Sequence, residues 1–257
     1  MATSPNQFVW YELMTTDPEA AEAFYGSVVG WDYDDPNIPG RPYKVLLADK
    51  APIGGMMALP EEARATGLQP IWVGYIGVDD VDAAAKRLTE AGGTVHRAPE
   101  DIPGIGRFAV VADPQGATML LFRQTFEGEP PRPAPGTPGS VAWRELFAGD
   151  GEKAFDFYAQ QFGWTKDQAM PMGELGVYQL FAAGAEPVGA MHTKPPEVPA
   201  PFWLFYFAVE NIDAARERVA AGGGEVLFDP REVPNDMWVV HCRDPQGAVF
   251  ALVGPRI

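Results

Sequence analysis

The chain is short of cysteine, histidine and positive charge. Its 257 residues include one cysteine, Cys242, which excludes an internal disulfide framework and a metal site made only of cysteines. The three histidines, His96, His192 and His241, are not clustered at metal-ligand spacing. With 19 basic and 35 acidic residues the net charge is −16, so we expect no nucleic-acid partner. The same charge should favour neutral or cationic ligands.

The sequence also lacks an apolar run of membrane-spanning length and a recognisable signal peptide. We therefore predict a cytoplasmic protein with no membrane partner. Motifs of serine hydrolases, zinc peptidases, dithiol oxidoreductases and phosphate-binding loops are missing too. These absences exclude the commonest hydrolytic, redox and nucleotide-dependent activities that short motifs can reveal.

What the chain does contain is a long internal repeat. The segment FVWYELMTTDPEAAEAFYGSVVGW at residues 8–31 is echoed by VAWRELFAGDGEKAFDFYAQQFGW at residues 141–164, and DPQGA occurs twice. Self-similarity on this scale indicates a duplicated unit. Residues 125–140, rich in proline and glycine, form a linker. We predict one domain over residues 1–124 and a second over residues 141–257.

Each copy divides again into two modules with one order of elements. An alternating apolar run predicts a first strand, a helix with an Asp or Asn cap follows it, and further strands complete the module. In the first module the helix should end at Gly30, residues 32–42 should form a loop, and strands should cover 43–48 and 53–59. The fold class is therefore α+β, with four βαβββ modules.

This order of elements, with AxxFYxxxxGW in the first helix of each copy and DPQG before the last strand, resembles the vicinal oxygen chelate superfamily. The superfamily includes glyoxalase I, bleomycin-resistance proteins and extradiol dioxygenases, and the sequence looks most like its tandem two-domain, glyoxalase-like members. The resemblance implies two glyoxalase-like domains whose mixed sheets are cupped around a ligand. Because one chain supplies both copies of the unit, we expect a monomer with an internal pseudo-dimer.

The resemblance also implies where a divalent metal would bind, namely to His, Gln or Glu on first strands and to Glu on last strands. The side chains at those positions here offer no nitrogen or oxygen suited to Zn, Ni, Fe or Mn. They are Trp10, Val73, Trp143, Leu204, Leu120 and Ala251. We therefore predict no metal cofactor. The alternative is an atypical site for Zn, Ni, Fe or Mn that uses Glu12, Glu145, His192 or His241.

Two glutamates are the candidate catalytic residues. Glu12 shares a strand face with Trp10, and Glu145 shares one with Trp143, because side chains two residues apart on a strand point the same way. In an apolar cup, burial would raise the carboxyl pKa and suit a general acid or base, and a nearby indole would suit a cationic or hydroxylated ligand. The structural alternative is that each glutamate pairs with backbone or with an arginine such as Arg107.

The candidate ligand-binding residues are aromatic, thioether or imidazole side chains on predicted strands. They are Trp10, Tyr43, Met56, Tyr75, Trp143, Tyr178, His192, Tyr206, Trp238 and His241. The two histidines could shuttle protons. A place in the core is the structural alternative for each of these residues. Trp31 and Trp164, which follow the glycine after a first helix, are expected to be packing residues.

These observations lead to one functional hypothesis with two alternatives. The first is a glyoxalase or bleomycin-resistance-like protein with degenerate metal sites. It would bind a small apolar or aromatic molecule for sequestration, resistance or metal-free lyase or isomerase chemistry by Glu12 or Glu145. The alternatives are a divalent-metal-dependent enzyme with atypical ligands, either lactoylglutathione lyase-like or a dioxygenase, and a non-catalytic interaction protein whose cups are filled by side chains.

Overall fold

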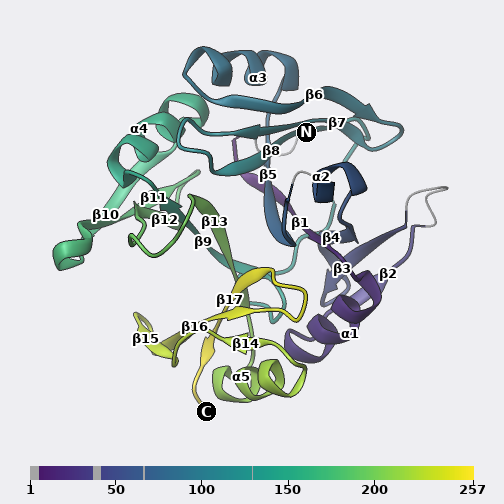
Figure 1. Cartoon of the computed structure of the whole chain (residues 1–257), viewed down its shortest axis with the longest axis vertical. Helices are drawn as coiled ribbons and strands as arrows, with labels where there is room; N and C mark the ends of the chain where they lie inside the picture. Colours follow the sequence, from purple (N-terminus) through teal and green to yellow (C-terminus); the bar gives the residue numbers. More distant parts are fainter. Residues whose placement is uncertain (1–5, 37–41, 66, 129) are drawn as a thin grey trace. The chain divides into compact units, whose positions relative to one another are not determined.

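The computed structural model describes residues 6–36, 42–65, 67–128 and 130–257, and its elements repeat in the expected order (Figure 1). The first module contains β1 (Phe8–Thr15), α1 (Pro18–Val28), β2 (Asp32–Asp34), β3 (Tyr43–Ala48) and β4 (Ala51–Ala58). A short helix, α2 (Glu61–Ala65), precedes the second module. That module contains β5 (Ile71–Gly77), α3 (Val81–Glu90), β6 (Thr94–Ile102), β7 (Gly106–Ala112) and β8 (Thr118–Gln124).

The second copy repeats this programme. The third module contains β9 (Val141–Ala148), α4 (Gly151–Phe162), β10 (Thr165–Pro171), the 3-10 turn η1 (Gly173–Leu175), β11 (Val177–Ala182) and β12 (Pro187–Thr193). The fourth contains β13 (Phe202–Ala208), α5 (Ile212–Ala221), β14 (Glu225–Val226), β15 (Arg231–Val233), β16 (Met237–Arg243) and β17 (Val249–Pro255). The predicted α+β fold with four βαβββ modules is confirmed.

The described strands form two mixed sheets. The first has the order β2-β3-β4-β1-β5-β8-β7-β6, and the second has the order β10-β11-β12-β9-β13-β17-β16-β14 with β15 paired to β16. In every module the first strand is parallel to the last, while the later strands pair antiparallel with one another. The helix that follows each first strand supplies the crossover connection that a parallel pair requires.

The four longer helices begin where the sequence predicts. Each has a capping side chain that accepts a hydrogen bond from the backbone N–H three residues later, which satisfies a donor that the first turn leaves unpaired. The capping residues are Asp17, Asp80, Asp150 and Asn211. At the other end of α4, Gly163 has a φ of 69°, a left-handed conformation that glycine adopts readily. None of the helices in the described ranges is long and apolar enough to cross a membrane.

Two local features differ from the sequence-based expectation. Part of the segment expected to be a loop forms β2, a short strand of DYD that pairs antiparallel with β3; residues 37–41 of that segment lie outside the described residues. Acidic residues disfavour strands, so β2 depends on its partner rather than on intrinsic propensity. The hairpin between β3 and β4 turns at Asp49 and Lys50, which both have positive φ, so β4 begins earlier than expected.

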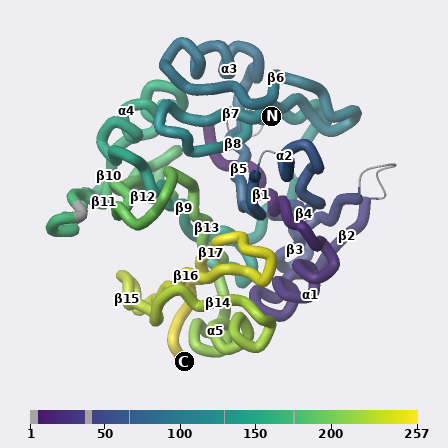
Figure 2. The backbone as a smooth tube through the Cα atoms, in the orientation of Figure 1, coloured from purple at the N-terminus to yellow at the C-terminus, as the bar shows by residue number. Residues whose placement is uncertain are grey.

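Packing divides the chain into two compact units, each with one module from each copy. Unit 1 consists of residues 1–10, 73–129 and 144–203, and unit 2 of residues 11–72, 130–143 and 204–257. Unit 1 thus contains most of the second and third modules, with α3 beside α4, and unit 2 contains most of the first and fourth, with α1 beside α5 (Figure 2). The domain limits predicted from the repeat follow a different division and stay a prediction.

A buried chain of hydrogen bonds fastens unit 2. Trp72 Nε1 donates to Tyr25 Oη at 2.9 Å, and Tyr25 Oη donates to Asp244 Oδ2 at 3.0 Å. The other oxygen of Asp244 accepts backbone N–H groups of its own DPQG turn. Burial raises the pKa of Asp244 and also raises the pKa of Tyr25 well above its ordinary value. The chain therefore ties the first helix of the molecule to its last tight turn.

Unit 1 contains the same arrangement. Trp203 Nε1 donates to Tyr158 Oη at 3.0 Å, and Tyr158 Oη donates to Asp113 Oδ2 at 3.2 Å. Burial again raises the pKa of both Asp113 and Tyr158. Trp31 and Trp164, 4% and 3% exposed, donate to the backbone oxygens of Gly139 and Asn6, which confirms the prediction that they are packing residues.

Candidate functional site

A glutamate and a histidine lie together in the interior of unit 1. Glu145 is on β9 and His192 on β12, and these two strands are parallel neighbours with Glu145 opposite Ala190. Glu145 Oε1 is 3.1 Å from His192 Nε2, and the two side chains are 7% and 5% exposed. Two of the predicted site residues are therefore in direct contact. Buried ionisable side chains need a partner, and these two provide one for each other.

The second ring nitrogen of His192 carries a hydrogen. His192 Nδ1 is 3.0 Å from the carbonyl oxygen of Thr193, and a carbonyl oxygen only accepts. Nε2 faces Glu145 Oε1 at 3.1 Å, a distance that suits an ion pair, although Nε2 has no aligned hydrogen-bond partner among the described residues. Two lone pairs at this distance would repel each other, so one of these two atoms carries a hydrogen and the pair handles protons as a unit.

Aromatic rings hold the imidazole in place. The Phe147 ring meets it edge to face with centroids 4.5 Å apart, and the Tyr178 ring lies at 5.6 Å with a tilt of 34°. Phe147 itself stacks on Phe202 at 4.9 Å. Together with the hydrogen bond from Nδ1 to the carbonyl oxygen of Thr193, these contacts fix the ring plane so that Nε2 points at Glu145.

Glu12, at the equivalent position in unit 2, has a different partner. Tyr43 Oη on β3 donates to Glu12 Oε2 at 3.0 Å, and Glu12 is 6% exposed. The residue opposite Glu12 on β4 is Gly55. A Cβ atom at position 55 would lie 1.9 Å from Tyr43 Oη, so the phenol occupies space that any other residue would fill. The contact between Tyr43 and Glu12 therefore requires this glycine.

The second copy has Ala190 where the first has Gly55, and His192 where the first has Met57. Ala190 has a methyl group where Gly55 leaves room for the hydroxyl of Tyr43. Tyr178, the counterpart of Tyr43, has its ring 5.6 Å from the His192 ring. One methyl group and one imidazole thus distinguish the surroundings of two otherwise equivalent glutamates.

The other predicted site residues are distributed over several surroundings. Tyr206 and His241 form a pair in unit 2, with Tyr206 Oη 2.6 Å from His241 Nε2. Tyr75 is 7% exposed and its ring meets Phe122 at 5.9 Å. Met56 lies opposite Leu13, on the face of the sheet away from Glu12, whereas Met57 is on the same face as Glu12.

The tryptophan candidates lie nearer the surface. Trp10 and Trp143 are half-buried on β1 and β9, two residues before the glutamates. The guanidinium group of Arg256 lies over the Trp238 ring, 4.0 Å from its centroid. Nε and Nη2 of Arg256 each donate a hydrogen bond to one carboxylate oxygen of Asp213. The ligand-binding roles of these residues stay predictions.

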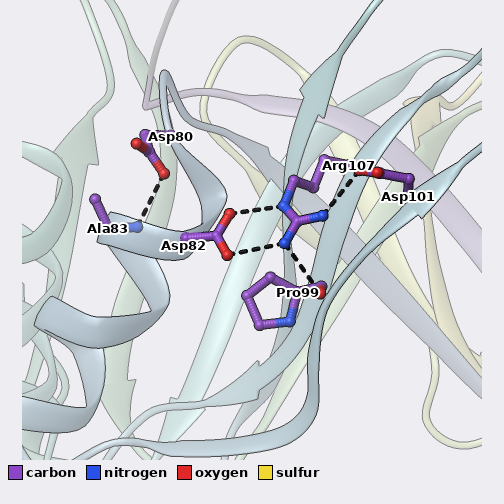
Figure 3. Close-up of polar contacts among 6 residues, drawn as sticks. All are labelled: Asp80, Asp82, Ala83, Pro99, Asp101 and Arg107. Atoms are coloured by element: carbon purple, nitrogen blue, oxygen red, sulfur yellow. Dashed lines mark hydrogen bonds and ion pairs between the residues drawn. The ribbon is translucent and has the colours of Figure 1, made fainter.

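Arg107, considered above as a partner for the glutamates, has other acceptors (Figure 3). It donates to both carboxylate oxygens of Asp82 on α3 and to Asp101 on β6, and it also reaches the carbonyl oxygen of Pro99. Hydrogen bonds from Arg107 lower the pKa of Asp82. The cluster is exposed, so it belongs to the surface of the second module.

The residues at the expected metal positions do not fit a metal. Val73, Leu204, Leu120 and Ala251 are buried and apolar, and in the described part of the chain no three His, Cys, Asp or Glu side chains are grouped to hold an ion. In unit 1, Glu145 and His192 provide only two donor side chains, which already face each other. That the protein works without a metal cofactor stays a prediction.

Sequence reasoning missed three contributors to these pairs. Gly55 and Ala190 decide which side chain reaches each glutamate, and Phe147 orients the imidazole. The difference between GGMM and GAMH at equivalent positions is visible in the sequence, and it would have identified the first two. No sequence signal distinguishes Phe147 from an ordinary core residue.

The chain matches the family model described as Glyoxalase/Bleomycin resistance protein/Dioxygenase superfamily over residues 7–120 and 140–252. It is 34% identical over 255 residues to "Putative glyoxylase CFP32" of Mycobacterium bovis, with 96% of this chain and 94% of that protein covered. It is 31% identical over 277 residues to "Anthracycline biosynthesis protein DnrV" of Streptomyces peucetius, with 98% and 94% covered.

Solved structures are similar in fold at low sequence identity. The Mn(II)-bound glyoxalase from Novosphingobium aromaticivorans has a TM-score of 0.68 and 15% identity, with 99% of this chain and 83% of that chain covered. The 2,3-dioxygenase LapB from Pseudomonas sp. KL28 has a TM-score of 0.67 and 15% identity, with 99% and 94% covered.

Proposed function

Because the chain belongs to the glyoxalase, bleomycin resistance and dioxygenase superfamily but carries no donor side chains at the expected metal positions, we propose that it binds a small aromatic molecule and acts on it without a metal. Glu145 and His192 would transfer a proton in a lyase or isomerase step. The observation that carries this proposal is the buried contact between Glu145 and the unaligned Nε2 of His192.

The chemistry proposed for the pair is general base catalysis. Glu145, as a carboxylate, takes a proton from the ligand, while Nδ1 of His192 keeps its hydrogen bond to the carbonyl oxygen of Thr193. His192 Nε2 holds the other side of the carboxylate, and burial strengthens this contact because little water screens it. Return of the proton to another atom of the ligand completes an isomerisation, and loss of a leaving group completes a lyase reaction.

The ligand class follows from the surroundings and the charge. The rings of Phe147 and Tyr178 beside the imidazole favour a flat apolar ligand, and the net charge of −16 favours a neutral or cationic one. The relative named for anthracycline biosynthesis supports a polycyclic aromatic substrate. We also propose that the protein works as a monomer without nucleic acid or membrane partners, which light scattering after gel filtration would check for the oligomeric state.

Sequestration of such a molecule without turnover is the second candidate function. It is favoured by the Glu12 and Tyr43 pair, which has a hydrogen-bonding hydroxyl where unit 1 has an imidazole. A carboxylate paired with a phenol can bind a ligand polar group, but the phenol is a much weaker base than imidazole near neutral pH.

Anthrone provides a direct test, because it is a flat tricyclic ketone whose methylene protons exchange through an enol. We expect the chelator-treated protein to accelerate deuterium exchange at that carbon, followed by NMR. The variants His192→Met and Glu145→Gln should lose about 10²- to 10⁴-fold of this acceleration, the usual contribution of a general base. The exposed His96 provides the matched control, His96→Met, which should exchange at the wild-type rate.

Two results would overturn the proposal. Undiminished exchange in both His192→Met and Glu145→Gln would exclude the pair as the base. Loss of exchange on chelation, with recovery when Zn, Ni, Fe or Mn is added, would favour the metal-dependent alternative instead. Binding of anthrone, measured by quenching of tryptophan fluorescence, without any exchange would leave sequestration as the function.

A further inference from the structure

Tyr206 and His241 form a second polar pair, in unit 2, that the proposed reaction does not use. Tyr206 on β13 and His241 on β16 are both opposite Ala251, which lies on the strand between them. Side chains in one row across neighbouring strands point to the same face. Tyr206 and His241 therefore meet beside the methyl group of Ala251, with Tyr206 Oη 2.6 Å from His241 Nε2.

The pair leads from the interior of unit 2 towards its surface. Tyr206 is 5% exposed, whereas His241 is half-buried. The ring of Phe228 lies 4.5 Å from the imidazole and is 38% exposed, and the guanidinium group of Arg231 lies 5.1 Å from the Phe228 ring. A buried hydroxyl is thus connected through an imidazole to an accessible aromatic side chain.

The second module builds the same row of strands without this pair. Tyr75 corresponds to Tyr206, but it lies opposite Leu120, which in turn lies opposite Val110. Leucine and valine are therefore compatible with the module design at the places of Ala251 and His241. A small residue at the place of Ala251 also occurs in the first and third modules, as Gly55 and Ala190, but the imidazole is particular to the fourth module. Its place in the other modules is taken by Val45, Val110 and Leu180, which argues against a role in packing alone.

We propose that Tyr206 and His241 form a proton relay that binds and ionises a phenolic hydroxyl group of an aromatic ligand. This inference rests on the proposed function for the presence of such a ligand. The hydroxyl bond of the ligand breaks and its proton passes to Tyr206 Oη, while the proton of Tyr206 passes to His241 Nε2. The products are a ligand phenolate and an imidazolium, and no oxidant, reductant or further reactant is needed.

In this relay Tyr206 contacts the ligand and His241 acts through Tyr206. Phe228, 38% exposed beside His241, offers the ligand an apolar contact at the outer end of the relay. The ligand class is therefore narrower than an aromatic molecule in general, because it must carry an acidic hydroxyl group on the ring. A hydroxylated anthraquinone has both features.

Alizarin, 1,2-dihydroxyanthraquinone, tests the relay because its visible absorption moves to longer wavelength when a hydroxyl group ionises. At a pH below its ionisation in water, we expect wild-type protein to bind alizarin with the spectrum of the ionised form. Tyr206→Phe and His241→Gln should each reduce the ratio of ionised to neutral bound probe by about tenfold or more, equivalent to one pKa unit. Tyr33, in the middle of β2, and the exposed His96 lie outside the relay, so Tyr33→Phe and His96→Gln are matched controls and should leave the spectrum unchanged.

The outcomes separate this inference from the proposed function. Alizarin that binds wild type with the neutral spectrum, or that stays ionised in both Tyr206→Phe and His241→Gln, overturns the relay and leaves the proposed function standing. Failure of both alizarin and anthrone to bind overturns the proposed function, and the relay with it. Circular dichroism of each variant identifies loss of folding. Ala251→Leu gives an independent test, because it introduces between Tyr206 and His241 the residue that the second module has there. This variant should also abolish the shift of the alizarin absorption to longer wavelength.

Discussion

Glu12 and Glu145 occupy equivalent positions on β1 and β9, yet one is paired with a phenol and the other with an imidazole. The difference originates on the neighbouring strand, where β4 has Gly55 and β12 has Ala190. The glycine leaves room for the hydroxyl of Tyr43, whereas the second copy has a methyl group there and a histidine two residues further on. Both copies of the repeat have the glutamate. The chemistry that each copy can perform therefore depends on the residues of the strand beside that glutamate.

Each unit is stabilised internally by the same kind of buried hydrogen-bonded chain. The same three residue types, tryptophan, tyrosine and aspartate, form a buried hydrogen-bonded chain in each unit. The two units therefore share this hydrogen-bonded framework and differ in their polar pairs. Four measurements can break or sharpen this contrast, and they are given from the largest expected effect to the smallest.

Gly55→Ala should have the largest effect on stability. Its Cβ would lie 1.9 Å from Tyr43 Oη, so the hydroxyl must leave Glu12 and a buried carboxylate loses a donor. We expect a loss of about 2–4 kcal/mol in the free energy of unfolding, from overpacking and the unmade hydrogen bond together. Urea denaturation measures this loss.

The matched change in the other copy, Ala190→Gly, should cost only about 0.5–1 kcal/mol in the free energy of unfolding, from the greater backbone entropy of glycine. Equal costs would show that Gly55 and Ala190 do not determine the partners of the glutamates.

Tyr25→Phe and Tyr158→Phe should test whether the two units are equally dependent on their hydrogen-bonded chains. Each substitution removes a donor to a buried aspartate and an acceptor for a tryptophan. We expect each to lower the free energy of unfolding by about 2 kcal/mol, as for a hydrogen bond to a charged group. Thermal and urea unfolding of the two variants should agree within about 0.5 kcal/mol. A loss in one variant alone would contradict the equivalence of the two units.

Asp113 and Asp244 should make stability depend on pH in the same way in both units. Burial raises the folded-state pKa of each aspartate above the value of about 3.9 expected when unfolded. A raised carboxyl pKa stabilises the fold fully below the unfolded pKa, and this contribution is lost as the pH rises through the folded pKa. The free energy of unfolding of wild type, relative to that of Asp113→Asn or Asp244→Asn, should therefore fall as the pH rises from about 4. A rise instead would mean that the hydrogen bonds to these carboxylates outweigh their burial.

The smallest effect should come from the surface arginines. Arg107 binds Asp82 and Asp101, whereas Arg256 binds Asp213 and covers the ring of Trp238. Arg256 is exposed and Arg107 is half-buried beside exposed aspartates, so Arg107→Ala and Arg256→Ala should lower the midpoint of thermal unfolding only slightly. High salt should diminish the loss for Arg107→Ala more than for Arg256→Ala, because screening weakens ion pairs and leaves ring contact in place. The reverse order would show that the Trp238 contact contributes less than the ion pairs.

Much of the fold is predictable from short-range patterns. The repeat shows that the modules are related, Asp17 and Asn211 mark helix starts, and alternation places Glu12 on the face of Trp10. These signals depend only on neighbouring residues. The strand β2 is not predictable in this way, because its acidic residues form a strand only when β3 is beside them.

The candidate site is less predictable. The alternation of side chains along a strand shows which face of the sheet a side chain is on, but not which residues it contacts. It could not show that Tyr43 extends over Gly55, or that Met56 faces Leu13 and leaves Met57 on the side of Glu12. The arrangement of the compact units is also hidden, since Tyr25 meets an aspartate more than 200 residues further along the chain. No local pattern relates two residues that are brought together only by packing of distant modules.

That long-range hydrogen bond has a consequence for synthesis on the ribosome. Tyr25 is synthesised 219 residues before its acceptor Asp244, so unit 2 cannot be completed until the fourth module has been made. Unit 1 ends at residue 203 and can close while the fourth module is still being translated. The first module must therefore wait with its partner surface exposed. We expect nascent chains to depend on chaperones most strongly at residues 11–72. Limited proteolysis of ribosome-bound intermediates tests this.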